Sequence, residues 1–207
     1  MTIRRQLQVH ESSRSSLSGV EVEVARSGAR SLRLRWVARG AVRNIRLPKL
    51  HAIARADTEE VCRFSLFARA VGKGEHLRLD VFPSGKWELA LFASRTGQRS
   101  KFTSGSVSQF DILERLKPLS ADKRAKLKQS GFDTLERFEP SFLSVSATLE
   151  LKPNYEIPPE TDWELGAAAL IEEKNGNQSC WALAHPPGVP DLGHPDSFAI
   201  RLPTSAS

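Results

Sequence analysis

Apolar and polar residues alternate with a period of two along most of this chain of 207 residues. The clearest alternating runs cover residues 20–24, 32–36, 62–68, 77–81 and 143–151. A strand that buries one face and exposes the other has this period, because successive side chains point to opposite faces of a sheet. The pattern therefore predicts several short β-strands, each with a single apolar face.

Turn-forming residues separate these runs. Pro83, Ser84 and Gly85 lie between two strand-like runs, and Asn175 with Gly176 lies between two others. Both groups are typical of β-hairpin connections. Many short strands joined by such turns predict an all-β fold, which we expect to be an antiparallel, jelly-roll-like β-sandwich. We expect residues 1–207 to form a single domain.

The period changes between residues 107 and 139. Val107, Phe110, Leu113 and Leu116 recur at intervals of three, Ser120 can cap a second helix, and Gly131 can end it. The spacing predicts a helical insertion near residues 107–139. Its apolar side is expected to pack on the sandwich or to form a lid or a docking face for a partner.

The net charge of +6 is unevenly distributed. Residues 1–50 contain eleven Lys and Arg against three Asp and Glu, whereas residues 141–207 contain three against nine. A basic surface of this kind can bind nucleic acid or an acidic protein. The arginines alternate with apolar residues, however, which is typical of the solvated face of a strand, and no aromatic residues are interleaved for base stacking. Nucleic-acid binding is therefore not expected, and an acidic protein partner remains an alternative.

The sequence contains no run of apolar residues long enough to span a membrane and no apolar segment of a secretory signal. Two cysteines, Cys62 and Cys180, lie in alternating apolar runs and are expected to be buried free thiols. We expect a cytoplasmic protein that does not associate with membranes.

Motifs of known catalytic sites are absent from the sequence. It has no G-x-S-x-G elbow, no phosphate-binding P-loop, no H-E-x-x-H and no G-x-G-x-x-G. Neighbouring carboxylates such as Glu59 and Glu60 would point to opposite faces of a strand and so would not converge on one substrate. We therefore expect a protein that is not an enzyme.

One proline-rich segment, WALAHPPGVPDLGHPDSF at residues 181–198, combines His185, Asp191, His194 and Asp196. These side chains are potential metal ligands. The prolines exclude a helix and are typical of rigid turns. Three interpretations stay open: a structural turn, the rim of a ligand pocket, or a metal site.

The four tryptophans bear on ligand binding, because an exposed indole can stack on the face of a sugar. Trp36, Trp87 and Trp163 alternate with their strand neighbours and are candidates for the core. Trp181 shares a strand face with Leu183 and His185, and it is the favoured aromatic residue of a pocket.

Three segments, FPSGKWELALF, LGAAALIEE and NGNQSCWALAHPPGVPDLGHPDSFAIRL, resemble the bacterial DOMON-like family. That family is similar to DOMON ligand-binding domains and to family nine of the carbohydrate-binding modules. The resemblance covers about residues 30–100 and 141–203, and it implies a jelly-roll-like β-sandwich that binds a small ligand. The candidate ligand-binding residues are Trp87, Arg78, Asp80, Trp181, His185, Asp191 and His194.

The chain departs from the family pattern at several polar positions. Val61-Cys62-Arg63-Phe64 stands where the family has Thr-Cys-Phe-Glu, Arg78 and Asp80 stand where Glu and Asn are usual, and a Tyr-Arg pair is missing near Arg95. Haem is disfavoured, because the only methionine is Met1 and haem-binding DOMON domains use histidine and methionine as axial ligands. No cofactor and no metal are expected.

Three functional hypotheses follow, of which the least favoured, an enzyme or metal protein, depends on His185, Asp191, His194 and Asp196. The first is a non-catalytic module that binds a carbohydrate-like or other small polar ligand. The alternative is an interaction or scaffold domain with a degenerate pocket, which docks an acidic partner through its basic N-terminal half or through the helical insertion.

Overall fold

A computed structural model describes most of the chain. The described residues are 2–47, 61–92, 99–101, 106–113, 142–151, 157–158, 160–192 and 194–204. Within them the fold is almost entirely β, and the helices are two short 3-10 turns, η1 (Val42–Asn44) and η3 (Pro195–Ser197).

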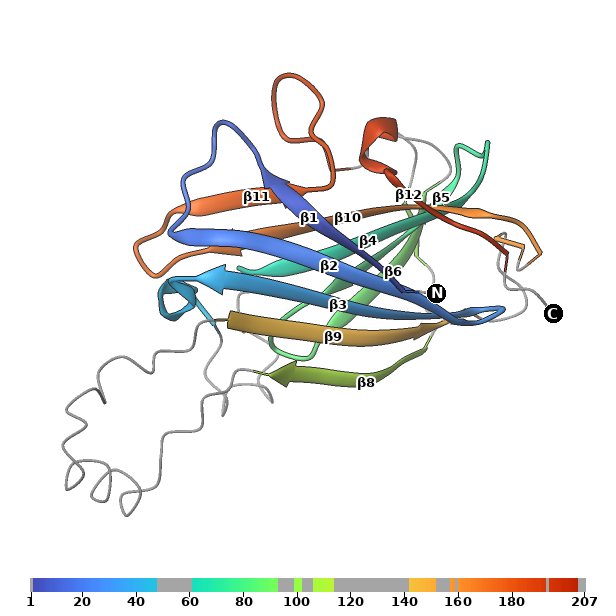
Figure 1. Ribbon diagram of the computed structural model, residues 1–207, viewed down its shortest axis with the longest axis horizontal. Helices are drawn as coiled ribbons and strands as arrows, with labels where there is room; N and C mark the ends of the chain where they lie inside the picture. The colour runs from blue at the N-terminus through green and yellow to red at the C-terminus, as the bar shows by residue number, and fades with distance from the viewer. Residues whose placement is uncertain are drawn as a thin grey trace, which may run out of the picture.

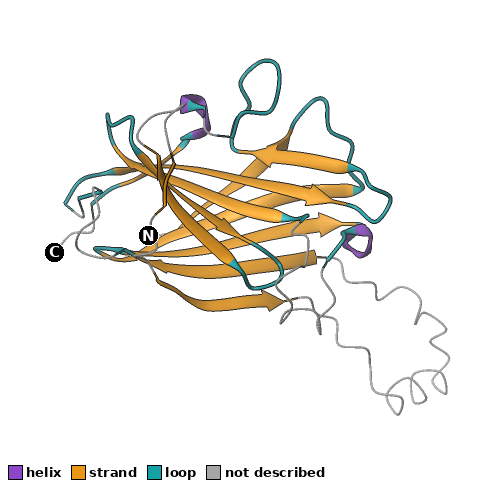
Figure 2. Cartoon of the chain, turned by 180° about the vertical axis from the view of Figure 1, so that it is seen from behind, coloured by secondary structure: helices purple, strands orange, loops and turns teal. Residues whose placement is uncertain are grey.

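Twelve strands of the described residues form one antiparallel sheet (Figures 1 and 2). The strands are β1 (Thr2–Val9), β2 (Leu17–Gly28), β3 (Ser31–Gly40), β4 (Arg63–Ala70), β5 (His76–Val81), β6 (Trp87–Phe92), β7 (Arg99–Lys101), β8 (Ser106–Leu113), β9 (Phe142–Glu150), β10 (Trp163–Glu172), β11 (Gln178–Ala182) and β12 (Ile200–Leu202). Their order across the sheet is β7-β6-β5-β4-β10-β11-β1-β2-β3-β9-β8, and β12 pairs with β10 next to β11.

The sheet curls so that its two halves, here called arms, face each other (Figure 1). The first arm contains β1, β2, β3, β9 and β8, and the second contains β11, β12, β10, β4, β5, β6 and β7. Strand β1 belongs to both arms, because its residues up to Leu7 pair with β2 whereas Gln8 and Val9 pair with β11. The all-β, antiparallel part of the prediction is confirmed, and the jelly-roll connectivity stays a prediction.

The core lies between the inner faces of the two arms. Trp36 of β3 and Phe64 of β4 meet there, with ring centroids 6.0 Å apart. Val22, Leu79 and Trp163 are fully or almost fully buried around them. Each large apolar side chain buried in this way contributes about 1.5–3 kcal/mol. The apolar residues of the alternating runs therefore form the inner faces of both arms, which enclose one core.

The predicted hairpin turns are present. Gly85 has a φ of 90°, and the turn from Phe82 to Lys86 closes with a hydrogen bond from Phe82 N to Lys86 O of 3.0 Å. Gly176, with a φ of 86°, occupies the corresponding turn between β10 and β11. Glycine accepts this left-handed backbone without the steric penalty of a Cβ atom.

The predicted helical insertion is wrong over residues 107–113, because these residues belong to strand β8. Strand β8 pairs with β9, and the register shifts between Ser108 and Asp111, where three steps along β8 match two along β9. One extra residue at such an irregularity produces an interval of three between apolar positions, which imitates a helical period. The rest of the predicted insertion, residues 114–139, lies outside the described residues.

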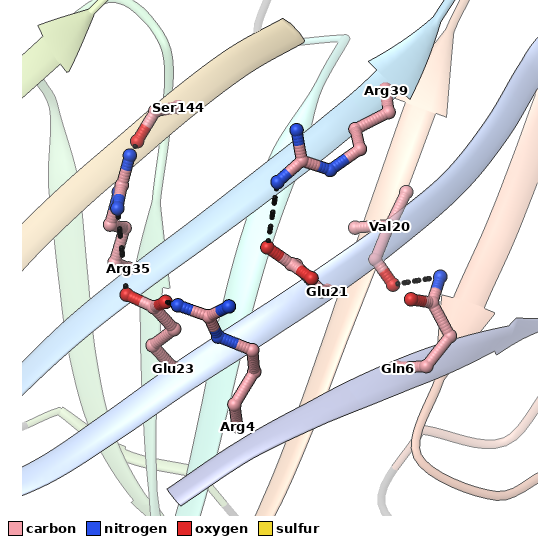
Figure 3. A network of polar contacts seen from close by, with 8 residues as sticks. All are labelled: Arg4, Gln6, Val20, Glu21, Glu23, Arg35, Arg39 and Ser144. Atoms are coloured by element: carbon pink, nitrogen blue, oxygen red, sulfur yellow. Dashed lines mark hydrogen bonds and ion pairs between the residues drawn. The ribbon is translucent and has the colours of Figure 1, made fainter. Parts of the chain in front are cut away.

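The first arm carries several arginines of the basic N-terminal half on its outer face, and glutamates pair with three of them, Arg4, Arg35 and Arg39 (Figure 3). Glu23 pairs with Arg4 and, at 3.6 Å, with Arg35, and Glu21 pairs with Arg39 at 3.1 Å. This network is the solvated strand face that the alternation predicted. Exposed pairs of this kind contribute little to stability, about 0–1 kcal/mol each.

The outer face of the second arm is partly covered by the C-terminal loop, defined here as residues 183–192 and 194–199. Leu192 and Phe198 of this loop pack on Phe67 of β4, Ala168 of β10 and Ala182 of β11. Phe67 interrupts the polar face of its strand in the sequence, and this second, smaller core explains why.

Gly166 of β10 allows the loop to approach the sheet. A Cβ atom at this position would lie 2.9 Å from the backbone oxygen of Ser197 in η3, closer than atoms pack without a shift.

No helix in the described part of the chain is long and apolar enough to cross a lipid bilayer.

We expect Gly166→Ala to displace the C-terminal loop and to lower the free energy of unfolding by about 1–3 kcal/mol, because the clash is with backbone. Urea denaturation measures this change. Gly74→Ala is the control, because a Cβ there meets nothing within 4 Å. Equal stabilities of the two variants would contradict this close approach.

Candidate functional site

A groove of about 770 Å³ opens on the outer face of the second arm, beside the part that the C-terminal loop covers. We call it the outer groove. It is lined by Arg63 of β4, Arg78 and Asp80 of β5, the turn residues Phe82, Gly85 and Lys86, and Trp87, Glu88, Ala90 and Phe92 of β6.

Strand register brings the polar residues of the groove together. The turn at Phe82–Lys86 pairs Asp80 with Glu88 and Arg78 with Ala90, and β4 places Ser65 opposite Asp80. Directly paired residues of antiparallel strands point to the same face of a sheet. Leu77, Leu79 and Val81 therefore enter the core while the residues between them face the groove.

Asp80 is the centre of the polar cluster, and it is only 7% exposed. The Ser65 hydroxyl donates a hydrogen bond of 2.5 Å to Asp80 Oδ1, and Arg78 Nε donates one of 3.0 Å to the same oxygen. Arg63 Nε lies 3.7 Å from Asp80 Oδ1. A buried carboxylate needs such partners to offset the loss of its hydration.

Arg63 is held less completely than Arg78. Burial lowers the pKa of its guanidinium, Asp80 opposes that shift, and Arg78 adds to it. The buried Nε of Arg63 has no hydrogen-bond acceptor among the described residues. Arg63 and Arg78 therefore lie beside Asp80, Glu88 also favours the charged form of Arg63, and the planar N–H groups of both arginines are on the lining of the groove.

Aromatic rings form the other part of the site. Trp87 borders the groove at the start of β6, but it pairs with Val81 on the inner face of the sheet, and its side chain packs against the core. Phe92, at the end of β6, stacks on His76 with ring centroids 5.2 Å apart and planes 7° apart. The groove thus offers apolar ring surface beside a polar cluster, the combination found in sites for small ligands.

His76 connects the groove to the C-terminal loop. Its ring is buried, and it contacts Phe198 of the loop edge-to-face at 5.6 Å. Arg69 lies over the other ring of this contact, with its guanidinium carbon 4.1 Å from the Phe198 centroid. Burial lowers the pKa of His76 from its usual 6.5, and Arg69 and Arg78 lower it further.

Of the seven candidate residues, Arg78 and Asp80 face the outer groove together, whereas Trp87 borders the groove but its side chain packs against the core. Trp181 lies elsewhere: it is 5% exposed, belongs to the core, and donates from Nε1 to Ser179 Oγ at 2.9 Å. The sequence placed Trp181 correctly on a face with Leu183, but that face is the inner one, so its indole is not available for stacking on a ligand.

The histidines of the proline-rich segment hold the segment in place, His185 by contacts with the end of β1 and the residue after it and His194 within its turn. His185 Nε2 bonds Gln8 O at 2.9 Å, and its ring meets His10 edge-to-face. His194 caps η3, accepting at Nδ1 a hydrogen bond of 3.3 Å from Asp196 N, and Asp191 O accepts one of 3.3 Å from His194 N. In the described ranges, no three His, Cys, Asp or Glu side chains gather as a metal site would require.

Arg63 and Phe92 were missing from the candidate residues. Arg63 was noticed only as a departure from the family pattern, although it shares the polar face of its strand with Ser65. Pairing β4 with β5 and β5 with β6 through their connecting turns would have placed Arg63 near Asp80. The sequence does not say which residues of two neighbouring strands pair, however. Arg95, the site of another departure, lies outside the described residues.

Both cysteines are buried, and neither forms a disulfide, as predicted. Burial raises the pKa of the Cys180 thiol to about 11. This thiol is therefore protonated near neutral pH, and a protonated thiol is a poor nucleophile.

No family model matches this chain, and no curated protein sequence matches it. Its structure is similar to that of a Bacteroides uniformis protein described as a "putative carbohydrate-binding protein", with a TM-score of 0.53 and 11% identity over 95% of this chain and 84% of that one. At this identity the similarity shows a common fold alone. Membership of the DOMON-like family stays a prediction.

We expect Asp80→Ala to lower the free energy of unfolding by about 1–3 kcal/mol, because it leaves Ser65 and Arg78 without their shared acceptor and Arg63 without its ion-pair partner. Glu21→Ala, which breaks an exposed pair with Arg39, is expected to cost less than about 0.5 kcal/mol. Chemical denaturation of both variants measures the difference. An equally small effect at Asp80 would contradict its role as the centre of the cluster.

The lowered pKa of His76 predicts a pH dependence of stability. The unfolded chain binds a proton at this histidine near pH 6.5 and the folded chain only at lower pH, so the stability from this group is lost as the pH falls below 6.5. His76→Phe keeps an aromatic ring against Phe92 and removes the titration. We expect the variant to lose less stability than the parent between about pH 8 and pH 5 in urea titrations. Equal losses would count against this assignment.

Proposed function

We propose that this protein is a non-catalytic binding module and that its outer groove holds a carbohydrate-like or other small polar ligand. The observation that carries the proposal is the combination of an aromatic ring, that of Phe92, with the polar cluster of Asp80, Arg78 and Arg63 in one open groove.

The chemistry of the groove suits a sugar. A pyranose ring presents C–H groups on its faces and hydroxyls around its edge, so it can pack on an aromatic ring while hydrogen-bonding to planar side chains. Phe92 offers ring surface, and the guanidinium groups offer several donors in fixed directions. The carbohydrate binding named for the Bacteroides uniformis protein supports the same ligand class, as does the resemblance to the DOMON-like family.

The bonding of Asp80 supports binding without catalysis. Ser65 and Arg78 both donate to this carboxylate, which has its partners in place without a ligand. A general acid or base needs a proton site directed at the substrate. Asp80 instead positions the arginines, and in this proposal the domain holds a ligand unchanged.

The alternative, a docking surface for an acidic partner, has weaker support. Arg4, Arg35 and Arg39 of the basic N-terminal half already pair with glutamates on the same face, as Figure 3 shows. An acidic partner would have to compete with these pairs. The outer groove, which combines buried charge with aromatic surface, is the better candidate for specific recognition.

A panel of neutral and acidic oligosaccharides, screened by thermal shift and confirmed by calorimetry, tests the proposal. We expect at least one sugar to stabilise the protein, since ligand that binds the folded state raises its melting temperature. Phe92→Ala and Arg78→Ala are each expected to weaken binding about 10- to 100-fold, because each removes one main contact. Arg39→Ala, an ion-paired arginine on the other arm, is the matched control and should bind normally. Absence of binding by any sugar would overturn the proposal.

A further inference from the structure

Strand β1 has one side that pairs with no other strand over most of its length. On the β2 side, every residue from Thr2 to Leu7 has a partner, whereas on the opposite side the paired residues are Gln8 and Val9, which meet β11. Strand β11 ends at Ala182, opposite Gln8, and the chain then leaves the sheet as the C-terminal loop. Among the described strands, β1 therefore has an unpaired side up to Leu7, which we call the free edge.

The hydrogen bonding at the end of β1 shows which backbone groups face the free edge. His10 N, directly after the strand, donates a hydrogen bond of 2.8 Å to Cys180 O of β11, on the side away from β2. In an antiparallel strand, the N–H and C=O groups of every second residue point to the same side. The backbone groups of Thr2, Arg4 and Gln6 therefore point to the free edge, where another strand could pair with them.

Arg5 interrupts the apolar inner face of β1 at the middle of the free edge. Ile3 and Leu7, two residues before and after it, are buried in the core, and Arg5 shares their face of the sheet because it pairs with the fully buried Val22. The side chain of Arg5 is nevertheless exposed. Its Nη1 donates a hydrogen bond of 3.0 Å to Arg4 O, a carbonyl that points to the free edge. The guanidinium therefore turns away from the core and lies at this edge.

The charge of Arg5 has no partner of opposite sign. Arg4 pairs with Glu23, whereas no carboxylate pairs with Arg5 within the described ranges. A strand added at the free edge would cover Arg5 against the apolar core and take its charge out of water, which is costly for an unpaired cation. Inward-pointing charges of this kind on edge strands prevent the sheets of separate molecules from pairing.

We infer that Arg5 keeps the free edge of β1 from pairing with the same edge of a second copy of this chain. Two identical edges can pair about a two-fold axis, because such an interface joins the same surface of both molecules. In an antiparallel pairing centred on Arg4, the two Arg4 side chains lie opposite each other, and Arg5 of each copy lies opposite Ile3 of the other. Like charges in opposite positions and two covered cations both disfavour this dimer. The inference does not depend on the ligand of the outer groove, which lies on the other arm.

The test compares self-association of the full, untagged chain with that of Arg5→Val, a variant in which the inner face of β1 is apolar throughout. Sedimentation velocity over a series of protein concentrations measures the equilibrium between monomer and dimer. We expect the substitution to raise the association constant about 10-fold or more, because each dimer no longer covers two cations.

Further variants assign the change to the charge and to the edge. Arg5→Lys keeps the charge and should associate like the parent. Arg33→Val is the matched control, because β3 is paired with β2 on one side and β9 on the other, so loss of this exposed arginine uncovers no edge. Gln6→Pro removes an N–H group that points to the free edge, and it should restore the monomer when combined with Arg5→Val.

Circular dichroism and thermal unfolding establish that each variant is folded, and Arg5→Thr gives the second reading if Arg5→Val fails to fold. An Arg5 variant that associates no more than the parent would overturn the inference. So would association that Gln6→Pro does not reverse, because another surface would then be used, or an equal increase with Arg33→Val. A parent chain that dimerises and loses its dimer on Gln6→Pro would also overturn it, because the edge would then pair in the presence of Arg5.

Discussion

The inner faces of the two arms must be buried against each other, and Trp36 of β3 meets Phe64 of β4 in that contact. A flat sheet with one apolar face could not satisfy this requirement, whereas a curled one buries both halves in a single core. Strand β1, which pairs with both β2 and β11, holds the two arms in one sheet. The outer faces, freed from core packing, carry the polar chemistry of the molecule.

The outer faces of the two arms differ in what their side chains contact. On the first arm, arginines and glutamates of neighbouring strands neutralise one another at the surface. On the second arm, the C-terminal loop covers Phe67, and the uncovered part becomes the outer groove. Gly166 allows the C-terminal loop to approach the sheet, and His76 lies between this loop and the outer groove. The packing of the loop therefore sets one boundary of the proposed binding site.

The alternation of single strands predicted much of the fold and part of the site. It assigned core positions such as Val22, Trp36 and Leu79, and the turn chemistry of Gly85 and Gly176 located two hairpins. It failed at Val107–Leu113, where an irregularity in pairing changes the spacing of apolar residues without changing the strand. Trp181 shows a second kind of error: period two says which residues share a face but not whether that face is inner or outer.

For this protein the sequence by itself determined the class of fold, the residues that share each strand face, the positions of two hairpins and the buried state of both thiols. Tertiary structure decided which faces meet, and therefore that Trp181 fills the core, that the proline-rich segment forms a cover, and that Arg63 joins Arg78 at Asp80. The physical reason is the distance along the chain over which each property is determined. Side-chain alternation and turn propensity are properties of neighbouring residues, whereas the outer groove depends on the register between strands, which is set by the packing of the whole sheet.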